Sequence, residues 1–388
     1  MLKNRDIIIF GDDWGRYPST IQHIGRVLAE NNRVMWIGSL GLRKPEFKLS
    51  DLKRAFEKLS SVFHQKVPRA EEGASPVIKV HPFVIPLHDI KIVQMLNKIL
   101  LLRKLRAAVK EHRFKNPVLI TSSPVMSQIV GCLDESSVHY ICLDDYSHFK
   151  GAFKRLVEFE NSLLEKADSC FAVSETLINS RKTPKGNPHY LPQGVDLEHF
   201  NMQCRKIPEA LKGIRKPVIG YFGIVAPLWT NISLIIRAAK EYPEYEFLII
   251  GRVEMDISGF NAAGNIKYIG EVPYSDLPDY AKLFDVGIIP FEENNLTRAC
   301  NPIKLYEYLA MGIPVVSTDL TEVRKFSDLV FIAKSEDEFI RLIKTAVEDS
   351  TAERNQARSQ RAMEYSWKAV TEKITDVILN TESKKNSF

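Results

Sequence analysis

Short apolar runs alternate with helical patterns along almost the whole chain, and this alternation constrains the fold more than any other feature. In the first half, the runs rich in β-branched and aromatic residues are 6–10, 33–38, 77–83, 117–122, 139–144 and 169–174. In the second half they are 217–223, 246–251, 266–270, 286–291, 313–318 and 329–333. Most of these runs precede an amphipathic stretch. Strands without polar alternation are buried on both faces, as in a parallel sheet covered by helices. The pattern therefore predicts an α/β chain with two doubly wound, Rossmann-like domains.

The length agrees with two hydrophobic cores. A chain of 388 residues exceeds what one core usually serves. Residues 193–216 have no strand pattern, and a new apolar strand follows them directly. We expect a first domain over 1–195, a second over 196–365, and a C-terminal helix over 366–388 that crosses back to the first domain. Apolar residues at helical spacing mark one face of that helix: Trp367, Val370, Ile374 and Ile378.

Composition and cysteine spacing exclude several classes of protein. With 45% hydrophobic and 26% charged residues, the chain has the composition of a soluble globular protein. Its first apolar run is too short for a signal peptide, and no run approaches the roughly 20 apolar residues that span a bilayer. We therefore expect a cytoplasmic protein. The five cysteines stand singly, which predicts reduced thiols and no metal site.

The charge is distributed unevenly between the two halves of the chain. Residues 1–200 hold 29 Lys and Arg against 22 Asp and Glu, a net charge of +7. Residues 201–388 hold 24 against 26, a net charge of −2. Such asymmetry suggests that the first half binds something anionic.

Loops that follow strands are the first places to look for a ligand. In open α/β sheets, ligands bind beyond the carboxyl ends of the strands, where helix N-termini offer unpaired N–H groups. After the first strand, Ser19 and Gln22 have the spacing of a capping box, so a helix should begin near Thr20. The loop before it would contribute these acceptor-side candidates: Asp12, Asp13, Trp14 and Arg16. The alternative is an ordinary acidic turn.

Two adjacent carboxylates lie at the end of the fifth predicted strand: Asp144 is the last residue of the run 139–144, and Asp145 follows it. Such pairs often serve only as turn formers or helix caps. Burial by neighbouring apolar residues could instead raise a carboxylate pKa towards that of a general base. We name Asp144 as the candidate base and Asp145 as an acceptor-side residue.

The second half offers two glycine loops and one charged helix. Gly223 and Gly251 follow strands, glycine lets a phosphate approach the backbone closely, and Arg252 would add a positive charge. A further stretch, "NPIKLYEYLAMGIPVVST", predicts a helix that starts at Asn301 and Pro302.

On that helix, Lys304 and Glu307 lie one turn apart. The lysine would neutralise a diphosphate near the positive end of the helix dipole, and the glutamate would accept hydrogen bonds from a ribose diol. The alternative is a surface ion pair of little energetic value.

These motifs, in this order, resemble a known family. The stretches "PQGVDLEHF", "VIGYFG", "LIIGR", "IKYIGEVPYSDLPDYAKLFDVGIIPF" and "NPIKLYEYLAMGIPVVST" are similar to those of GT-B glycosyltransferases, particularly bacterial family 4-like enzymes of surface and exopolysaccharide assembly. In the first half, "GDDWGRYPSTIQHIGRVLAENNRVMWI" and "YICLDDYS" are similar to teichuronic-acid-type and xanthan glucuronosyltransferase-like proteins. The resemblance implies two Rossmann-like domains that face each other across a cleft.

The resemblance also implies roles for individual residues. The second domain would hold a nucleotide-sugar, commonly a UDP-sugar, and the first would bind a saccharide acceptor, without a metal cofactor. Glu307 matches the second glutamate of the E-x7-E motif that holds the ribose, and Lys304 matches a lysine that contacts the diphosphate. Asp144 matches the aspartate proposed as catalytic base. The loop against which the nucleobase packs would be Glu271, Val272 and Pro273.

Two positions depart from the family pattern. The first glutamate of E-x7-E would fall at Ala299, and the loop after Gly223 lacks the Arg and Lys that many retaining members use. Both departures favour an inverting transfer, and the resemblance implies that the transferred group is hexosyl or uronosyl. In that reaction Asp144 deprotonates the acceptor hydroxyl and Lys304 stabilises the leaving nucleotide.

A basic stretch at 88–115 suggests a polyprenyl-linked acceptor. It carries apolar residues at helical spacing, interleaved with basic ones, in the half with positive net charge. A helix of this kind can lie on an anionic membrane, which would place the protein peripherally on the inner face of the cell membrane. The alternative is a core-facing helix with a solvated basic edge.

Other functions share parts of this pattern. Nucleotide-sugar 2-epimerases have the same two-domain form but need no lipid acceptor. A third hypothesis is a non-catalytic sugar-binding member of an assembly complex. Ala299 favours this hypothesis, whereas the presence of Asp144, Lys304 and Glu307 together disfavours it. A dehydrogenase is disfavoured because no GxGxxG follows the first strand. We expect no nucleic-acid partner.

Overall fold

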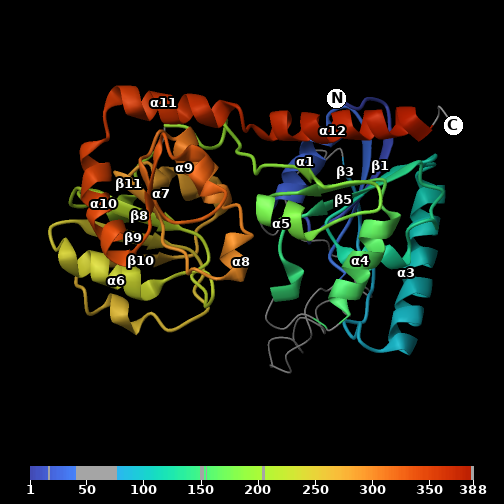
Figure 1. Ribbon diagram of the computed structural model, residues 1–388, viewed down its shortest axis with the longest axis horizontal. Helices are drawn as coiled ribbons and strands as arrows, with labels where there is room; N and C mark the ends of the chain where they lie inside the picture. Colours follow the sequence, from blue (N-terminus) through green and yellow to red (C-terminus); the bar gives the residue numbers. More distant parts are fainter. Residues whose placement is uncertain (16–17, 41–76, 149–152, 154, 203–205, 386–388) are drawn as a thin grey trace. The chain divides into compact units, whose positions relative to one another are not determined.

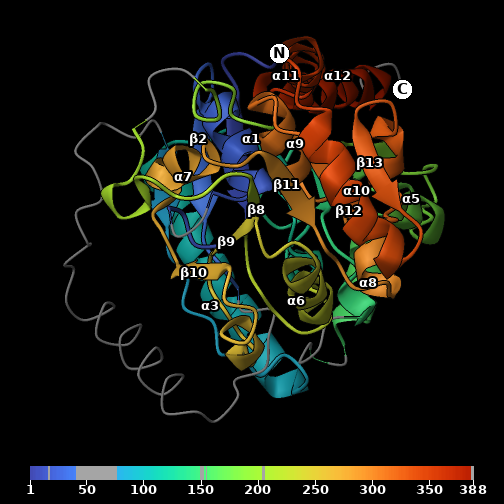
Figure 2. The ribbon, with the colours of Figure 1, turned by 90° about the vertical axis from the view of Figure 1, so that its left-hand side faces the viewer.

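The chain forms two compact units (Figures 1 and 2). The computed structural model describes residues 1–15, 18–40, 77–148, 153, 155–202 and 206–385. Unit 1 consists of Met1–Phe171, Arg181–His189 and Ile374–Phe388. Unit 2 consists of Ala172–Ser180 and Tyr190–Lys373.

Among the described residues, the first sheet has seven strands in the order β3-β2-β1-β4-β5-β6-β7. Its strands are β1 (Asp6–Phe10), β2 (Arg33–Ile37), β3 (Val77–Val80), β4 (Val118–Thr121), β5 (Ser137–Cys142), β6 (Ser169–Ala172) and β7 (His189–Tyr190). The pairs from β3 to β5 are parallel. All six residues of β5 are buried, whereas Lys79 on the edge strand β3 is exposed. A lysine on an edge strand discourages pairing with another chain.

The second sheet has six strands in the order β10-β9-β8-β11-β12-β13, and every adjacent pair is parallel. Its strands are β8 (Val218–Phe222), β9 (Glu246–Ile250), β10 (Ile266–Gly270), β11 (Val286–Ile289), β12 (Val315–Thr318) and β13 (Val330–Ala333). The four inner strands are buried throughout. Their continuous apolar runs are therefore the core of this unit.

Helices follow most of the strands. Among the described residues before 190, they are α1 (Thr20–Ala29), α3 (Lys91–Glu111), α4 (Leu156–Lys166) and α5 (Glu175–Ser180). The later ones are α6 (Ile232–Glu241), α7 (Leu277–Ala281), α8 (Asn295–Arg298), α9 (Ile303–Ala310), α10 (Glu336–Glu348), α11 (Ala352–Met363) and α12 (Trp367–Lys385). The expected apolar face of α12 is confirmed, since its four predicted residues are all buried. Arg5 of unit 1 pairs with Glu382 of α12 at 2.6 Å.

Two parallel sheets with interleaved helices confirm the predicted α/β, doubly wound fold class. Each run that the sequence predicts as a strand overlaps one, and β7 is an addition. Helix α1 begins at Thr20 as predicted, but the capping box is wrong, because the Ser19 side chain makes no capping bond. None of the described helices is both long and apolar enough to span a bilayer.

Candidate functional site

Two glycine turns meet at the carboxyl ends of β8 and β9. Gly223 has a φ of 139° and Gly251 a φ of 132°, both in a region that favours glycine. A Cβ atom on Gly251 would lie 2.0 Å from the carbonyl oxygen of Gly223. The Gly223 N–H donates to the Ile250 carbonyl at 2.9 Å. These two turns are therefore in backbone contact, and a side chain at Gly251 would force them apart.

Lys304 lies over the first of these turns. A Cβ atom on Gly223 would be 3.1 Å from the Lys304 Nζ. The same Nζ lies 4.8 Å from the ring centroid of Tyr221 and 4.5 Å from that of Phe291, within cation–π range. No carboxylate among the described residues forms an ion pair with it. The aromatic rings thus hold this ammonium group at the carboxyl ends of the strands, where an anion can bind to it.

Glu307 lies one turn further along α9 and is buried, with 8% of its surface exposed. Burial raises the pKa of its carboxyl to about 8, although the charge of Lys304 acts in the opposite direction. Within the described part of the chain, no donor is hydrogen-bonded to this carboxyl. The two residues are therefore not a surface ion pair, and a ligand hydroxyl that reached Glu307 would offset part of its desolvation cost.

Asn301 and Arg252 already have partners in the fold. The Asn301 amide donates to the Val173 carbonyl at 2.9 Å and accepts from the Tyr306 hydroxyl at 3.1 Å. The Arg252 guanidinium pairs with Glu254 at 2.7 Å. Asn301 thus fixes the start of α9, whose N-cap residue is Pro302.

The loop expected to contact a nucleobase follows the edge strand β10. Glu271 and Pro273 are exposed, while Val272 packs against the core of unit 2. Beyond it, the Tyr274 ring stacks on His199 with centroids 4.4 Å apart, and the His199 Nε2 lies 2.8 Å from the Tyr274 carbonyl oxygen. The backbone of this loop is therefore anchored at its end while two of its side chains face solvent.

In unit 1, the loop after β1 is held by side chains of α1. The Ser19 hydroxyl and the Gln22 amide both donate to the Asp12 carboxylate, at 3.1 and 2.9 Å. Gln22 also accepts from the Gly15 N–H at 3.0 Å. Desolvation raises the pKa of Asp12, and these two hydrogen bonds oppose the rise. The predicted capping box fails because both of its side chains bind this loop instead.

The neighbouring residues of the loop contact the end of β2. The Trp14 ring lies edge-on to Trp36, with centroids 4.7 Å apart, and the Arg26 guanidinium is 5.6 Å from the Trp14 centroid. Asp13 accepts from the Ser39 N–H at 3.2 Å. The remaining predicted residue, Arg16, lies outside the described residues.

Asp145, at the carboxyl end of β5, is a buried ion-pair partner. Burial would raise the pKa of its carboxyl, but hydrogen bonds from Arg181, at 2.7 Å, and from Ser147 and His148 lower that pKa to about 2. The idea that burial raises this pKa is therefore wrong for Asp145, because Arg181 compensates its charge. Asp144 is only partly buried.

Several residues that shape these sites carry no local sequence signal. Arg181 also contacts Glu160 at 3.3 Å, and Glu160 accepts from the Tyr140 hydroxyl at 2.8 Å. These partners are far apart in the sequence and meet only through the fold. Among the described residues, no group of three or more His, Cys, Asp and Glu is placed to hold a metal ion.

Comparisons with known proteins find similar sequences and similar folds. Residues 216–349 match the family of glycosyl transferases group 1. A putative teichuronic acid biosynthesis glycosyltransferase, TuaH of Bacillus subtilis (strain 168), is 30% identical over 193 residues. That alignment covers 46% of this chain and 48% of TuaH, so the chain matches about half the length of this relative.

Solved structures resemble the whole chain. Sucrose-phosphate synthase from Thermosynechococcus elongatus has a TM-score of 0.70 at 13% identity, over 98% of this chain and 100% of its own. Anabaena Alr3699/HepE in complex with UDP has a TM-score of 0.66 at 15% identity, over 96% of this chain and 100% of its own. At such identities the likeness establishes the fold alone. The chain therefore has the GT-B fold, and its residues 216–349 are similar to the glycosyl transferases group 1 family.

Proposed function

We propose that this chain is a glycosyltransferase that moves a hexosyl or uronosyl group from a UDP-sugar to a saccharide acceptor. The observation that carries the proposal is on α9, where the Lys304 ammonium lies over Gly223 and the buried Glu307 carboxyl lies one turn away. A cation beside glycine turns suits a diphosphate, and the carboxyl suits a ribose diol. The choice of uridine is supported by Alr3699/HepE, a protein of this fold whose structures contain UDP or UDP-glucose.

The proposed reaction is a single displacement with inversion. Asp144 removes the proton from an acceptor hydroxyl, and the oxygen attacks the anomeric carbon of the donor. The bond from that carbon to the phosphate oxygen breaks, and its electron pair leaves with UDP. Lys304 compensates the charge that develops on the leaving diphosphate. Because a lysine supplies this charge, we expect activity to persist in EDTA.

The proposed acceptor is a polyprenyl-linked saccharide at the inner face of the cell membrane, used in cell-surface polysaccharide assembly. The net charge of +7 on residues 1–200 supports an anionic partner for that half. The partial match to TuaH, described as a putative teichuronic acid biosynthesis glycosyltransferase, supports a surface polysaccharide.

The proposal is tested by acceptor-dependent release of UDP from UDP-sugars, with a lipid extract as acceptor source. Asp144→Asn should lower turnover by about 10²- to 10⁴-fold while UDP affinity stays unchanged, because the variant loses only the base. Glu165→Gln, an exposed position on α4, is the matched control and should keep full activity. Near-normal turnover of Asp144→Asn would exclude this base, and UDP-sugar turnover without any acceptor would favour an epimerase or hydrolase.

A further inference from the structure

The first turns of helix α3 bury polar side chains and expose apolar ones. Its buried face includes Gln94 and Asn97. The Asn97 side chain accepts from the Ile85 N–H at 2.9 Å and donates to the Ile85 carbonyl at 2.8 Å. Gln94 donates to the His88 carbonyl and accepts from Arg155 at 3.0 Å. The first turns of α3 are therefore attached to unit 1 by hydrogen bonds, which reverses the usual arrangement of a core-facing helix.

The outward face of these turns is apolar. The exposed fractions are 75% for Ile92, 62% for Met95, 42% for Leu96 and 47% for Ile99. Residues three or four apart lie on one side of a helix, so these four side chains form a continuous patch. Ile90, just before the helix, is 48% exposed. Contiguous apolar surface of this kind marks an interaction site in a soluble domain.

The same side of the helix becomes cationic towards its C-terminus. Arg103, Arg106 and Lys110 follow Ile99 at intervals of four, three and four residues, and all three are exposed. Over residues 90–115 the sequence has eight Lys and Arg and a single acidic residue. One stripe therefore runs from apolar to strongly basic along the outer side of α3, which lies at the edge of unit 1 in Figure 1.

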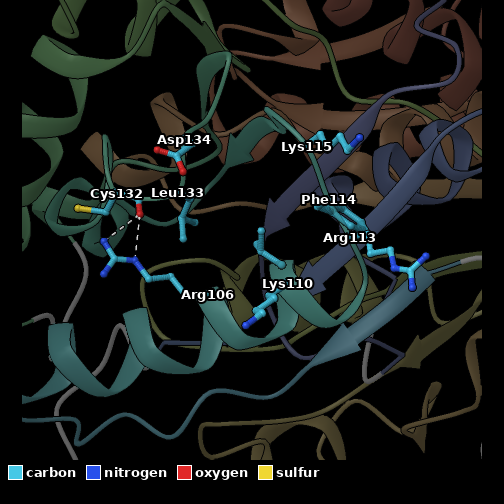
Figure 3. Close-up of a pocket in the computed structure, with 9 residues that line it drawn as sticks. Arg106, Lys110, Arg113, Phe114, Lys115, Cys132, Leu133 and Asp134 are labelled. Atoms are coloured by element: carbon cyan, nitrogen blue, oxygen red, sulfur yellow. Dashed lines mark hydrogen bonds between the residues drawn. The ribbon is translucent and has the colours of Figure 1, made fainter.

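A pocket of about 410 Å³ lies at the basic end of the stripe (Figure 3). Arg106, Lys110, Arg113 and Lys115 line it, against one carboxylate, Asp134. The Arg106 guanidinium donates to the Cys132 carbonyl at 3.3 Å. Figure 3 shows this contact, with Lys110 between Arg106 and Arg113.

This pocket does not lie beside the acceptor-side residues. Lys115 precedes the amino end of β4, whereas Asp12 and Asp144 follow the carboxyl ends of β1 and β5. Because these strands are parallel, the pocket lies at the amino ends of the strands and the acceptor-side residues lie at their carboxyl ends. The pocket is thus a second, cationic site in unit 1.

We propose that α3 docks unit 1 on an anionic lipid bilayer, with Ile92, Met95 and Ile99 entering the interface and the cationic pocket taking a lipid headgroup phosphate. The order of the stripe suits this role, since apolar side chains bind the acyl boundary and basic ones bind anionic headgroups. The inference rests on the proposed function for its purpose, which is to bring the enzyme to a lipid-linked acceptor. The donor site in unit 2 is not needed for docking.

Vesicle flotation of the full chain tests the proposal. Vesicles of phosphatidylcholine with phosphatidylglycerol should bind the protein at least about tenfold more tightly than phosphatidylcholine alone, and added salt should weaken the binding. Two double variants separate the parts of the stripe: Ile92→Ser with Met95→Ser, and Lys110→Glu with Arg113→Glu. Each should lose about tenfold or more in vesicle affinity.

Matched variants in unit 2 serve as controls. Met363→Ser removes an apolar side chain that is 60% exposed, and Lys344→Glu reverses an exposed charge; both should bind vesicles like wild type. UDP affinity should be unchanged in all variants, so a defect in folding or in the donor site is distinguished from a defect in docking. Equal binding to both vesicle types, wild-type binding by the pocket variant, or an α3-dependent dimer without vesicle binding would overturn the proposal.

Discussion

Replacing Glu307 by glutamine should remove a pH dependence from the stability of the ligand-free protein. The wild-type carboxyl has a pKa of about 8 when folded, against an ordinary value of 4.5, because it is buried. A raised carboxyl pKa means that the folded state holds its proton more tightly than the unfolded state. The linked stability is therefore complete below pH 4.5 and is lost as the pH rises through 8.

The magnitude follows from the interval between these two pKa values. At about 1.4 kcal/mol per pH unit, the free energy of unfolding changes by on the order of 4 to 5 kcal/mol between pH 4.5 and pH 8. For a unit of this size, each kcal/mol moves the melting temperature by about 2–4 °C. Glu307→Gln has no proton to lose, so near pH 9 it should melt roughly 10 °C above wild type.

The assay is thermal unfolding from pH 5 to pH 9, with hydrogen exchange of the β8, β11 and β12 amides as a local measure of unit 2. Glu348→Gln, an exposed position on α10, is the matched control and should follow wild type. UDP, if it binds through Glu307, should stabilise wild type more than the glutamine variant. Parallel pH profiles for wild type and Glu307→Gln would refute the reasoning.

Three further predictions concern packing and buried charge. Arg181→Met should lower the free energy of unfolding of unit 1 by about 3–5 kcal/mol, because it leaves the Asp145 carboxylate buried without its cation. Urea unfolding measures this change. A decrease of less than about 1 kcal/mol would contradict the pairing. Because the folded state lowers the pKa of Asp145 from 3.8 to about 2, the free energy of unfolding should fall as the pH drops through this interval. In Asp145→Asn, the free energy of unfolding should change less with pH over the same interval. Gly251→Ala should weaken UDP binding at least about tenfold, because its Cβ would meet the Gly223 carbonyl. Gly264→Ala, also at positive φ but in open space before β10, should bind UDP like wild type.

The fold was readable from the sequence because its strands are buried on both faces. Continuous apolar runs such as 218–222 and 286–289 need no tertiary information to be recognised. Strand β7, His189–Tyr190, was missed because two residues carry no periodicity, and only its place in the sheet defines it. The α1 capping box failed for a similar reason, since Gln22 reaches ten residues back to Asp12.

The candidate site could be predicted from the sequence only where its residues are close together along the chain. Lys304 and Glu307 share one helix, so their spacing alone indicates a common side. The aromatic faces that hold Lys304, from Tyr221 and Phe291, come from separate strand ends and gave no signal. Likewise, Arg181 lies 36 residues beyond Asp145, so the sequence did not reveal that this carboxylate is paired.

Helix α3 shows where periodicity misleads. The sequence indicated apolar and basic residues at helical spacing but left open which side packs on the domain. The structure buries Gln94 and Asn97 because the backbone near Ile85 and His88 offers them hydrogen bonds. Partners of this kind, rather than hydrophobicity, decide the orientation of the first turns of this helix.

Titration calorimetry of UDP and GDP against wild type, Lys304→Ala and Lys344→Ala tests the central claim most directly. The account predicts that wild type binds UDP in preference to GDP, that Lys304→Ala loses at least about tenfold in UDP affinity, and that Lys344→Ala, an exposed lysine in the same unit, binds like wild type. Equal UDP affinity in all three proteins, or no binding to wild type, would contradict the assignment of α9 and the glycine turns as the donor site.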